Sequence, residues 1–191
     1  MIIKMLVTMT PVILAGIMNM LFVRTYFCKK HNAPIDAGKL FFDGKRLFGE
    51  NKTWTGFFGM IAAGAVSQTF WGIICLTMLP DLNYFYEYHK NTILFNLAAG
   101  ALVGSAYVLF ELPNSFIKRR LDIPCGKTDK GIKGIIFFLV DQIDSLIGVG
   151  LVFAAICPMP VWQYFLYILL GAAIHIAVNL ILYKIKIRRN F

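Results

Sequence analysis

Apolar residues along this chain gather into five long segments that are separated by polar, glycine-containing connections. The segments cover approximately residues 5–23, 55–79, 93–110, 135–157 and 161–183. Each is close to the roughly 20 residues that a helix needs to cross a bilayer core of about 30 Å. The pattern therefore predicts an all-α polytopic membrane protein with five transmembrane helices, in which residues 1–191 form a single transmembrane domain.

The basic residues are distributed unevenly between the connections. Of the 19 Lys and Arg residues, all but Lys4 and Lys90 lie in the first connection, the third connection or the C-terminal tail. The positive-inside rule then places the N-terminus outside and the C-terminus in the cytosol of a cell-membrane protein. Two long loops, about 24–54 and 111–134, are expected to be cytosolic. This topology accounts for the net charge of +9, so no nucleic-acid partner is expected.

Small residues recur inside two of the segments. Gly100 and Gly104 are spaced by four residues in the third segment, and Gly59 and Ala63 have the same spacing in the second. Such spacing allows helices to approach closely, so these residues predict helix packing rather than catalysis. Three polar residues inside the segments are expected to form interhelical hydrogen bonds: Asn96, His175 and Asn179.

Two carboxylates stand three residues apart in "FFLVDQIDSLIG", residues 137–148. The spacing of Asp141 and Asp144 puts both on one helix face, and a lone carboxylate within a membrane helix costs about 2.5 kcal/mol or more. A bound divalent cation, an ion pair with a basic side chain from another helix, or a protonatable pair in a transport path would each satisfy them. Oxygen ligands without His or Cys favour Mg²⁺ over zinc, which makes both residues candidate magnesium ligands.

A dense basic cluster precedes the aspartate segment. The sequence "SFIKRR" supplies Ser115, Lys118, Arg119 and Arg120. Arginine can grip phosphate oxygens through two parallel hydrogen bonds, so the cluster indicates phosphate binding. The alternative is a topology anchor that contacts anionic lipid headgroups.

The first long loop ends in the glycine-punctuated stretch "FFDGKRLFGENKTWTGFFGM", residues 41–60. Its glycines permit tight turns, and its cations Lys45, Arg46 and Lys52 could contact phosphate oxygens. The stretch is therefore a candidate phosphate-binding loop. The alternative is a solvated loop with Trp54 at the membrane interface.

The chain resembles the CDP-archaeol synthase family, the archaeal-type relatives of the phosphatidate cytidylyltransferases. The resemblance rests on three stretches that occur in the family's order: "GENKTWTG", "SFIKRR" and "DQIDS". It extends over nearly the whole chain. The resemblance implies a nucleotidyltransferase that converts CTP and a lipid phosphate into a CDP-lipid and pyrophosphate with Mg²⁺, for phospholipid biosynthesis. The lipid could be an archaetidic acid-type ether or phosphatidic acid.

The resemblance also implies roles for individual residues. Asp141 and Asp144 hold the metal and act in catalysis together with Lys118 and Arg119. The expected substrate-binding residues are Asn51, Lys52, Thr53, Lys45, Arg46, Ser115 and Arg120. Many members of the family carry Gly-Asp shortly before the Ser-x-x-Lys-Arg segment, whereas this chain has Phe110-Glu111 there. Glu111 is the candidate replacement for the family's acidic residue.

Two other functions fit parts of the pattern. A small transporter or channel could line its path with the aspartate pair, although such proteins are expected to show internal repeats and none is visible in this sequence. A non-catalytic bundle that serves as a scaffold would leave the acidic pair unexplained. Release of pyrophosphate from CTP distinguishes the enzyme from both.

Overall fold

The computed structural model describes residues 1–126 and 131–184. In that part of the chain five helices are long and apolar enough to cross a membrane. They are α1 (Ile2–Phe22), α3 (Trp54–Thr77), α5 (Ile93–Arg120), α6 (Gly131–Ile156) and α7 (Val161–Lys184), and two short helices, α2 (Tyr26–Lys30) and α4 (Phe85–Tyr88), lie in the connections. The predicted all-α fold with five spans is confirmed. Residues 127–130 of the second predicted loop and 185–191 of the basic tail lie outside the described residues.

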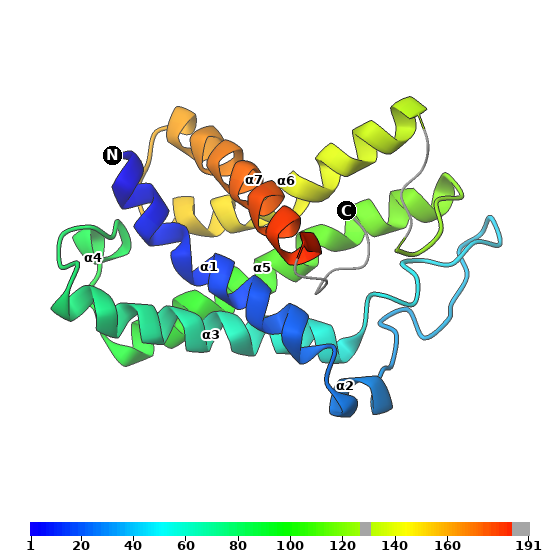
Figure 1. The fold of residues 1–191 in the computed structure, drawn as a ribbon, viewed down its shortest axis with the longest axis horizontal. Coiled ribbons are helices and arrows are strands. Elements are labelled where there is room, and N and C mark those ends of the chain that lie inside the picture. The colour runs from blue at the N-terminus through cyan, green and yellow to red at the C-terminus, as the bar shows by residue number, and fades with distance from the viewer. Residues whose placement is uncertain (127–130, 185–191) are drawn as a thin grey trace.

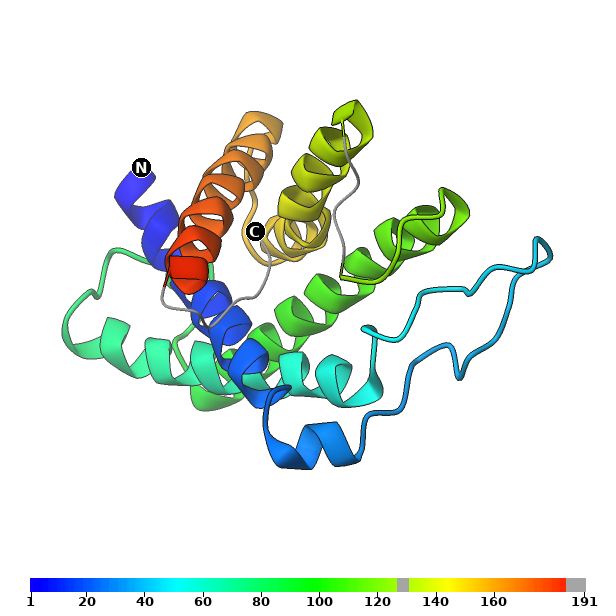
Figure 2. The ribbon, with the colours of Figure 1, turned by 45° about the vertical axis from the view of Figure 1, so that its right-hand side comes forward.

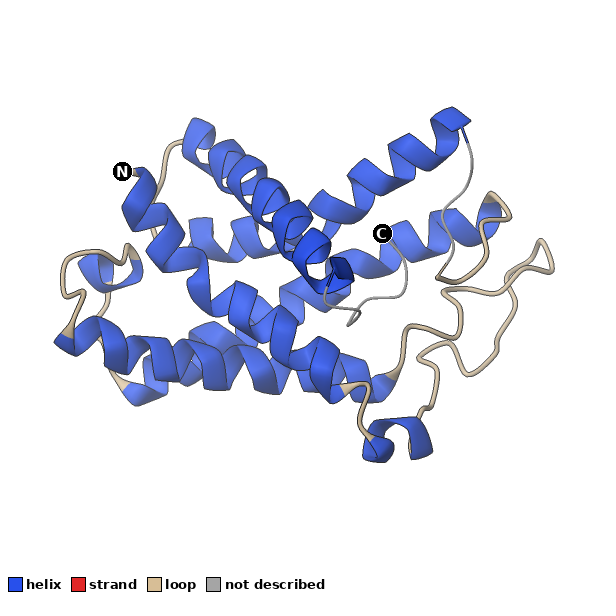
Figure 3. Ribbon diagram, in the orientation of Figure 1, coloured by secondary structure: helices blue, strands red, loops and turns tan. Residues whose placement is uncertain are grey.

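The connections separate to the two ends of the bundle. Figure 1 shows the long α2–α3 connection at one end, beside the end of α5 and the start of α6. The N-terminus, α4 and the α6–α7 connection lie at the other end, and the view in Figure 2 agrees. Figure 3 shows that the loops lie at the two ends and helices fill the middle. The basic connections of the sequence thus share one end of the molecule.

The crossing of α3 and α5 depends on glycine. A Cβ added at Gly64 of α3 would overlap the carbonyl oxygen of Gly100, and one at Gly104 would lie 2.6 Å from an α3 carbonyl oxygen. Gly59 instead faces α1, where an added Cβ would lie 2.6 Å from Asn19 Oδ1. The close helix approach predicted from these glycines is present, and it places α5 between α3 and α6.

The third membrane helix is longer than its apolar segment. The apolar residues end at Phe110, where the sequence predicted a loop, but α5 continues through Pro113 to Arg120. The polar side chains in this extension find partners on α6 and on the first loop, so the backbone can remain helical without exposing them to lipid. The basic last turn also complements the negative end of the helix dipole.

The polar residues within the spans are hydrogen-bonded, as expected. Asn96 accepts a hydrogen bond from a tyrosine hydroxyl at 2.9 Å. His175 Nε2 lies 3.2 Å from the hydroxyl of Tyr107, and Asn179 Nδ2 donates to Gln142 Oε1 at 3.2 Å. These bonds tie α7 to both α5 and α6.

Candidate active site

The extension of α5 brings a polar face against the aspartate helix. Lys118 Nζ lies 2.5 and 2.6 Å from the two carboxylate oxygens of Asp141. Asn114 Nδ2 donates to Asp141 Oδ1 at 2.7 Å and to Asp144 Oδ2 at 2.6 Å. Glu111, Asn114 and Lys118 share one face of α5 because residues three and four apart are neighbours on a helix. The two aspartates therefore converge on a single amide group.

The first loop adds a third segment to this site. Lys52 forms an ion pair with Glu111, and the side chains of both are 25% exposed. Burial alone lowers the pKa of Lys52, but the charge and hydrogen bond of Glu111, with smaller contributions from Asp144 and Asp141, outweigh it and raise the pKa above its ordinary value. Lys52 is held in place by α3, which begins just after it with Thr53 as its N-cap. A protonated lysine therefore lies beside the carboxylates.

The two aspartates differ in how their charges are compensated. Asp141 has the ion pair with Lys118, so the structural alternative considered from the sequence is present for this residue. Asp144 forms no ion pair within the described chain and accepts hydrogen bonds from Asn114 and from the backbone N–H of Ser145. Its negative charge is thus the less neutralised of the two.

The donor set around Asp144 suits a small divalent cation. Two carboxylates converge there, and Asn114 Oδ1 and Ser145 Oγ are buried with no hydrogen-bond partner in the described chain. The two carboxylates and the Ser145 hydroxyl offer hard oxygen atoms, which Mg²⁺ prefers, whereas Asn114 presents its amide nitrogen to both carboxylates. No group of three or more His, Cys, Asp or Glu side chains forms a metal-binding arrangement within residues 1–126 and 131–184. Mg²⁺ usually binds through one or two carboxylates together with substrate phosphates, and two carboxylates share the Asn114 amide here.

Asp36, which the sequence analysis did not single out, organises the first loop. Its carboxylate accepts hydrogen bonds from the Arg46 guanidinium at 3.0 Å and from the backbone N–H groups of Gly38, Phe48 and Gly49 at 3.0, 3.1 and 2.9 Å. Burial alone raises the pKa of Asp36, but these hydrogen bonds together outweigh it and hold the pKa below its usual range. The short spacing from Asp36 to Gly38 is typical of an Asx-turn and was the available sequence signal.

The remaining cations of the first loop and of α5 connect the two segments. Lys45 pairs with Asp122 at 2.7 Å, and Arg120 Nε lies 2.8 Å from Asp43. The Arg120 guanidinium also lies 4.5 Å from the ring centroid of Phe116, a cation–π distance. These residues link the loop to the end of α5 rather than pointing as a group at the aspartates.

Arg119 also faces the loop rather than the aspartates. Its guanidinium donates to Cys125 Sγ at 3.0 Å, and both side chains lie beside Gly49. Gly49 has a φ of +105°, and a Cβ there would overlap Cys125 Sγ, so the loop needs glycine at this position. Ser115 is half-buried near the same end of α5. Four of the predicted residues therefore lie together: Asp141, Asp144, Lys118 and Lys52. The predicted arginines and Lys45 instead form contacts within the first loop or between that loop and the end of α5.

A cavity of about 470 Å³ adjoins this cluster on the side of the first loop. Asn51, Lys52 and Thr53 line it together with Glu111 of α5 and Asn19 of α1. Three predicted substrate-binding residues thus border one space beside the carboxylates.

The fold has a counterpart among solved structures. The chain is similar to a structure described as an intramembrane enzyme for archaeal membrane lipid biosynthesis, with a TM-score of 0.64, 21% sequence identity and 92% coverage of both chains. At this identity the similarity establishes the fold. The class is that of helical intramembrane proteins with a polar site at one end of the bundle.

The sequence comparisons define the family. A CarS-like family model, described as CDP-archaeol synthase, matches residues 1–190. The chain is 33% identical to a CDP-archaeol synthase of Archaeoglobus fulgidus over 168 residues, which cover 81% of this chain and 82% of that protein. It is 36% identical to one of Pyrococcus furiosus over 154 residues, with 80% of each chain covered. The chain belongs to the CDP-archaeol synthase family.

Membership confirms the predicted family and the predicted class, a nucleotidyltransferase of the membrane and of lipid biosynthesis. The cytidylyltransferases suggest a metal-dependent reaction, in agreement with the donor set at Asp144. Nothing in the comparisons supports a transporter.

Proposed function

We propose that this protein transfers the cytidylyl group of CTP to a lipid phosphate. A phosphate oxygen of the lipid attacks the α-phosphorus of CTP, the bond from that phosphorus to the α–β bridging oxygen breaks, and pyrophosphate leaves with the electron pair. A phosphate monoester is already anionic near neutral pH, so no strong general base is required. The barrier lies in bringing two polyanions together, and positive charge lowers it.

The observation that carries this proposal is the convergence of Asp141, Asp144, Lys118 and Lys52 from α6, α5 and the first loop. Lys118 is paired with Asp141 and Lys52 with the neighbouring Glu111, and both ammonium groups can contact phosphate oxygens directly. Asp141 and Asp144 would hold Mg²⁺, which when bound withdraws charge from the triphosphate and orients it. In this assignment Lys118 exchanges part of its contact with Asp141 for a phosphate.

The proposed nucleotide site is the cavity beside the first loop. Asn51, Lys52 and Thr53 line it and can contact the triphosphate. The surrounding cations Lys45, Arg46, Arg119 and Arg120 raise the local positive potential, and their contacts fix the loop in place. Ser115 adds a hydroxyl at the same end of α5.

For the lipid, we propose an archaetidic acid-type ether phosphate. The curated relatives are named CDP-archaeol synthases, and the family model carries the same description. Phosphatidic acid is the competing substrate. The two differ in the linkage and branching of their chains and share the phosphate monoester that reacts.

The test uses purified protein in detergent with CTP and Mg²⁺. We expect pyrophosphate release and a CDP-lipid identified by mass spectrometry with archaetidic acid, with a higher kcat/KM than with phosphatidic acid. Omission of Mg²⁺ should abolish both products, and Ca²⁺ should not replace it. Absence of CDP-lipid with both lipids would reject the proposed function.

The site is proposed to face the cytosol from the cell membrane, with the N-terminus outside. The uneven distribution of Lys and Arg supports this orientation. In a cysteine-free background, a cysteine introduced at Lys45 should resist an impermeant thiol reagent applied to intact cells, and one at Asp81 should react. The opposite labelling pattern would invert the topology.

A further inference from the structure

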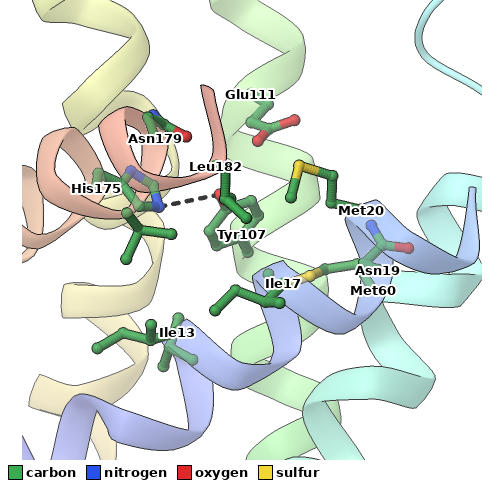
Figure 4. Close-up of a pocket in the computed structure, with 13 residues that line it drawn as sticks. Ile13, Ile17, Asn19, Met20, Met60, Tyr107, Glu111, His175, Asn179 and Leu182 are labelled. Atoms are coloured by element: carbon green, nitrogen blue, oxygen red, sulfur yellow. Dashed lines mark hydrogen bonds between the residues drawn. The ribbon is translucent and has the colours of Figure 1, made fainter. Parts of the chain in front are cut away.

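A second cavity, of about 220 Å³, lies within the membrane part of the bundle. Figure 4 shows it between α1, α5 and α7, with Ile13 and Ile17 of α1 on one side and His175 and Leu182 of α7 on the other. α1 packs mainly against α3 and touches α7 only sparsely. Gly16, Ile17 and Val178 in its lining are half-buried, so the cavity opens toward the lipid-facing surface between α1 and α7.

This intramembrane cavity meets the cavity of the first loop. Asn19 and Glu111 line both of them. Glu111 is the ion-pair partner of Lys52, and its charge acts on Asp144. A molecule that fills the intramembrane cavity therefore has one end beside the residues proposed to carry out the reaction.

The chemistry of the walls changes along the cavity. In Figure 4 the part farther from Glu111 is lined by the apolar side chains of Ile13 and Ile17. The part near Glu111 is more polar, because Asn19 of α1 also lines the cavity there. A ligand with an apolar chain and a polar head would match this change along the walls.

We propose that the intramembrane cavity binds the lipid phosphate, with the first carbons of one chain among the apolar residues and the glycerol phosphate beside Asn19 and Glu111. This assignment rests on the proposed function and names where its lipid substrate binds. The Asn19 amide and the ammonium group of Lys52, the ion-pair partner of Glu111, can donate to phosphate oxygens. An apolar cavity of about 150 Å³ can hold benzene, so this volume takes several carbons of a chain. The rest of the chain passes between α1 and α7 into the bilayer.

In this arrangement the two substrates reach the aspartates from opposite sides. The lipid enters laterally between α1 and α7, and CTP enters through the cavity of the first loop. The Lys52–Glu111 pair lies where the two cavities meet. Lys52 can thus exchange Glu111 for a phosphate once either substrate is bound.

Photolabelling tests the location without requiring turnover. A lipid phosphate with a diazirine near the glycerol end of one chain is incorporated into detergent micelles with the wild-type protein, and labelled peptides are mapped by mass spectrometry. We expect labels within 12–20 of α1 and 175–182 of α7, competed by unlabelled lipid phosphate and not by phosphatidylcholine. Labelling elsewhere would overturn the proposal. Equal competition by phosphatidylcholine would also overturn it, because the cavity would then be a general lipid crevice.

A graded substitution at Gly16 provides the kinetic test, because a Cβ at this position has no atom within 4 Å. Gly16→Leu should raise KM for the lipid phosphate about tenfold by occupying the space of two or three methylene groups, with KM for CTP unchanged. Gly16→Ala should raise KM for the lipid phosphate in the same direction but by no more than about twofold, since it adds a single methyl group to this space. Leu21→Phe, which adds bulk to an exposed position of the same helix, is the matched control and should change neither constant.

The two proposals fail in different ways. If the wild-type protein forms no CDP-lipid, the proposed function is wrong. If it forms CDP-lipid while Gly16→Leu keeps the wild-type KM for lipid, only the location of the lipid is wrong. If Gly16→Leu does not fold, the labelling pattern of the wild-type protein decides.

Discussion

Neutralising the aspartates one at a time separates a catalytic metal site from a structural ion pair. Asp141→Asn and Asp144→Asn keep the shape of the side chain and one oxygen ligand but remove the negative charge. If both carboxylates bind Mg²⁺, each variant should lose most of its activity while the bundle remains folded. If the pair serves stability alone, activity should persist while the free energy of unfolding falls.

The structure sets the expected magnitudes. A catalytic metal contributes several kcal/mol, and a loss of about 3 kcal/mol corresponds to a fall of about 100-fold in kcat. In the Lys118–Asp141 pair the aspartate is 40% exposed and the lysine 15% exposed. Because the aspartate is so exposed, Asp141→Asn should cost about 1 kcal/mol of stability, rather than the 3–5 kcal/mol that follows when one partner of a buried pair is removed.

Asp144→Asn should have a smaller effect on stability. The variant loses part of a charge-assisted hydrogen bond from Asn114 but also removes repulsion from Asp141 and Glu111. These two changes oppose each other, so the free energy of unfolding should stay within about 1 kcal/mol of wild type. Asp144→Asn should therefore separate loss of activity from loss of stability more clearly than Asp141→Asn.

The assay combines steady-state cytidylyl transfer with thermal unfolding in the same detergent, with and without Mg²⁺. Asp81→Asn, an exposed carboxylate in the connection after α3, is the matched control and should behave as wild type. We also expect Mg²⁺ and CTP together to raise the melting temperature of the wild-type protein but not of Asp144→Asn. Near-normal activity with a large loss of stability in both aspartate variants would refute the metal assignment.

Three further substitutions test the loop, the lysine and the helix crossing. Asp36→Asn should destabilise the first loop by about 3 kcal/mol. Because folding lowers the pKa of Asp36, the difference in melting temperature between wild type and this variant should be complete above about pH 4. It should shrink as the pH falls below that value. Lys52→Met should lower kcat/KM for CTP about 100-fold, whereas Lys39→Met, an exposed lysine in the same loop, should leave it unchanged. Gly100→Leu should abolish the recovery of monodisperse protein because its side chain would overlap the α3 backbone, whereas Gly16→Ala should be recovered normally.

The sequence predicted the membrane helices well because the bilayer imposes a simple requirement on length and hydropathy. Four of the five predicted segments match the observed helices within a few residues at each end. The third does not, because α5 extends from Phe110 to Arg120 as a polar helix. Hydropathy indicates which residues are stable in contact with lipid. This extension is instead stabilised by side chains of α6 and the first loop, and these come near it only in the folded structure.

The residues of the candidate site likewise differ in how far the sequence alone could identify them. Asp141, Asp144 and Lys118 could be found because charged residues within or beside an apolar segment are costly and stand out. Asn114 could not, since an asparagine near a helix end is common, and the Asx-turn spacing at Asp36 indicates a turn but not the contact with Arg46. Their importance lies in contacts between segments distant in sequence, such as the Asn114 amide shared by both aspartates.

The charge of the assembled cluster explains why a cation and a nucleotide should bind together. With all groups ionised, Asp141, Asp144 and Glu111 carry three negative charges and Lys52 and Lys118 carry two positive charges. These five side chains alone therefore carry one net negative charge, which favours the binding of a divalent cation. Once a divalent cation is bound the sign reverses, and Lys118 can leave Asp141 for a phosphate oxygen because the cation then compensates the charge of Asp141. The same carboxylates that hold the lysines in position in the absence of substrate thus make nucleotide binding depend on the metal, and CTP should bind measurably more weakly when Mg²⁺ is withheld.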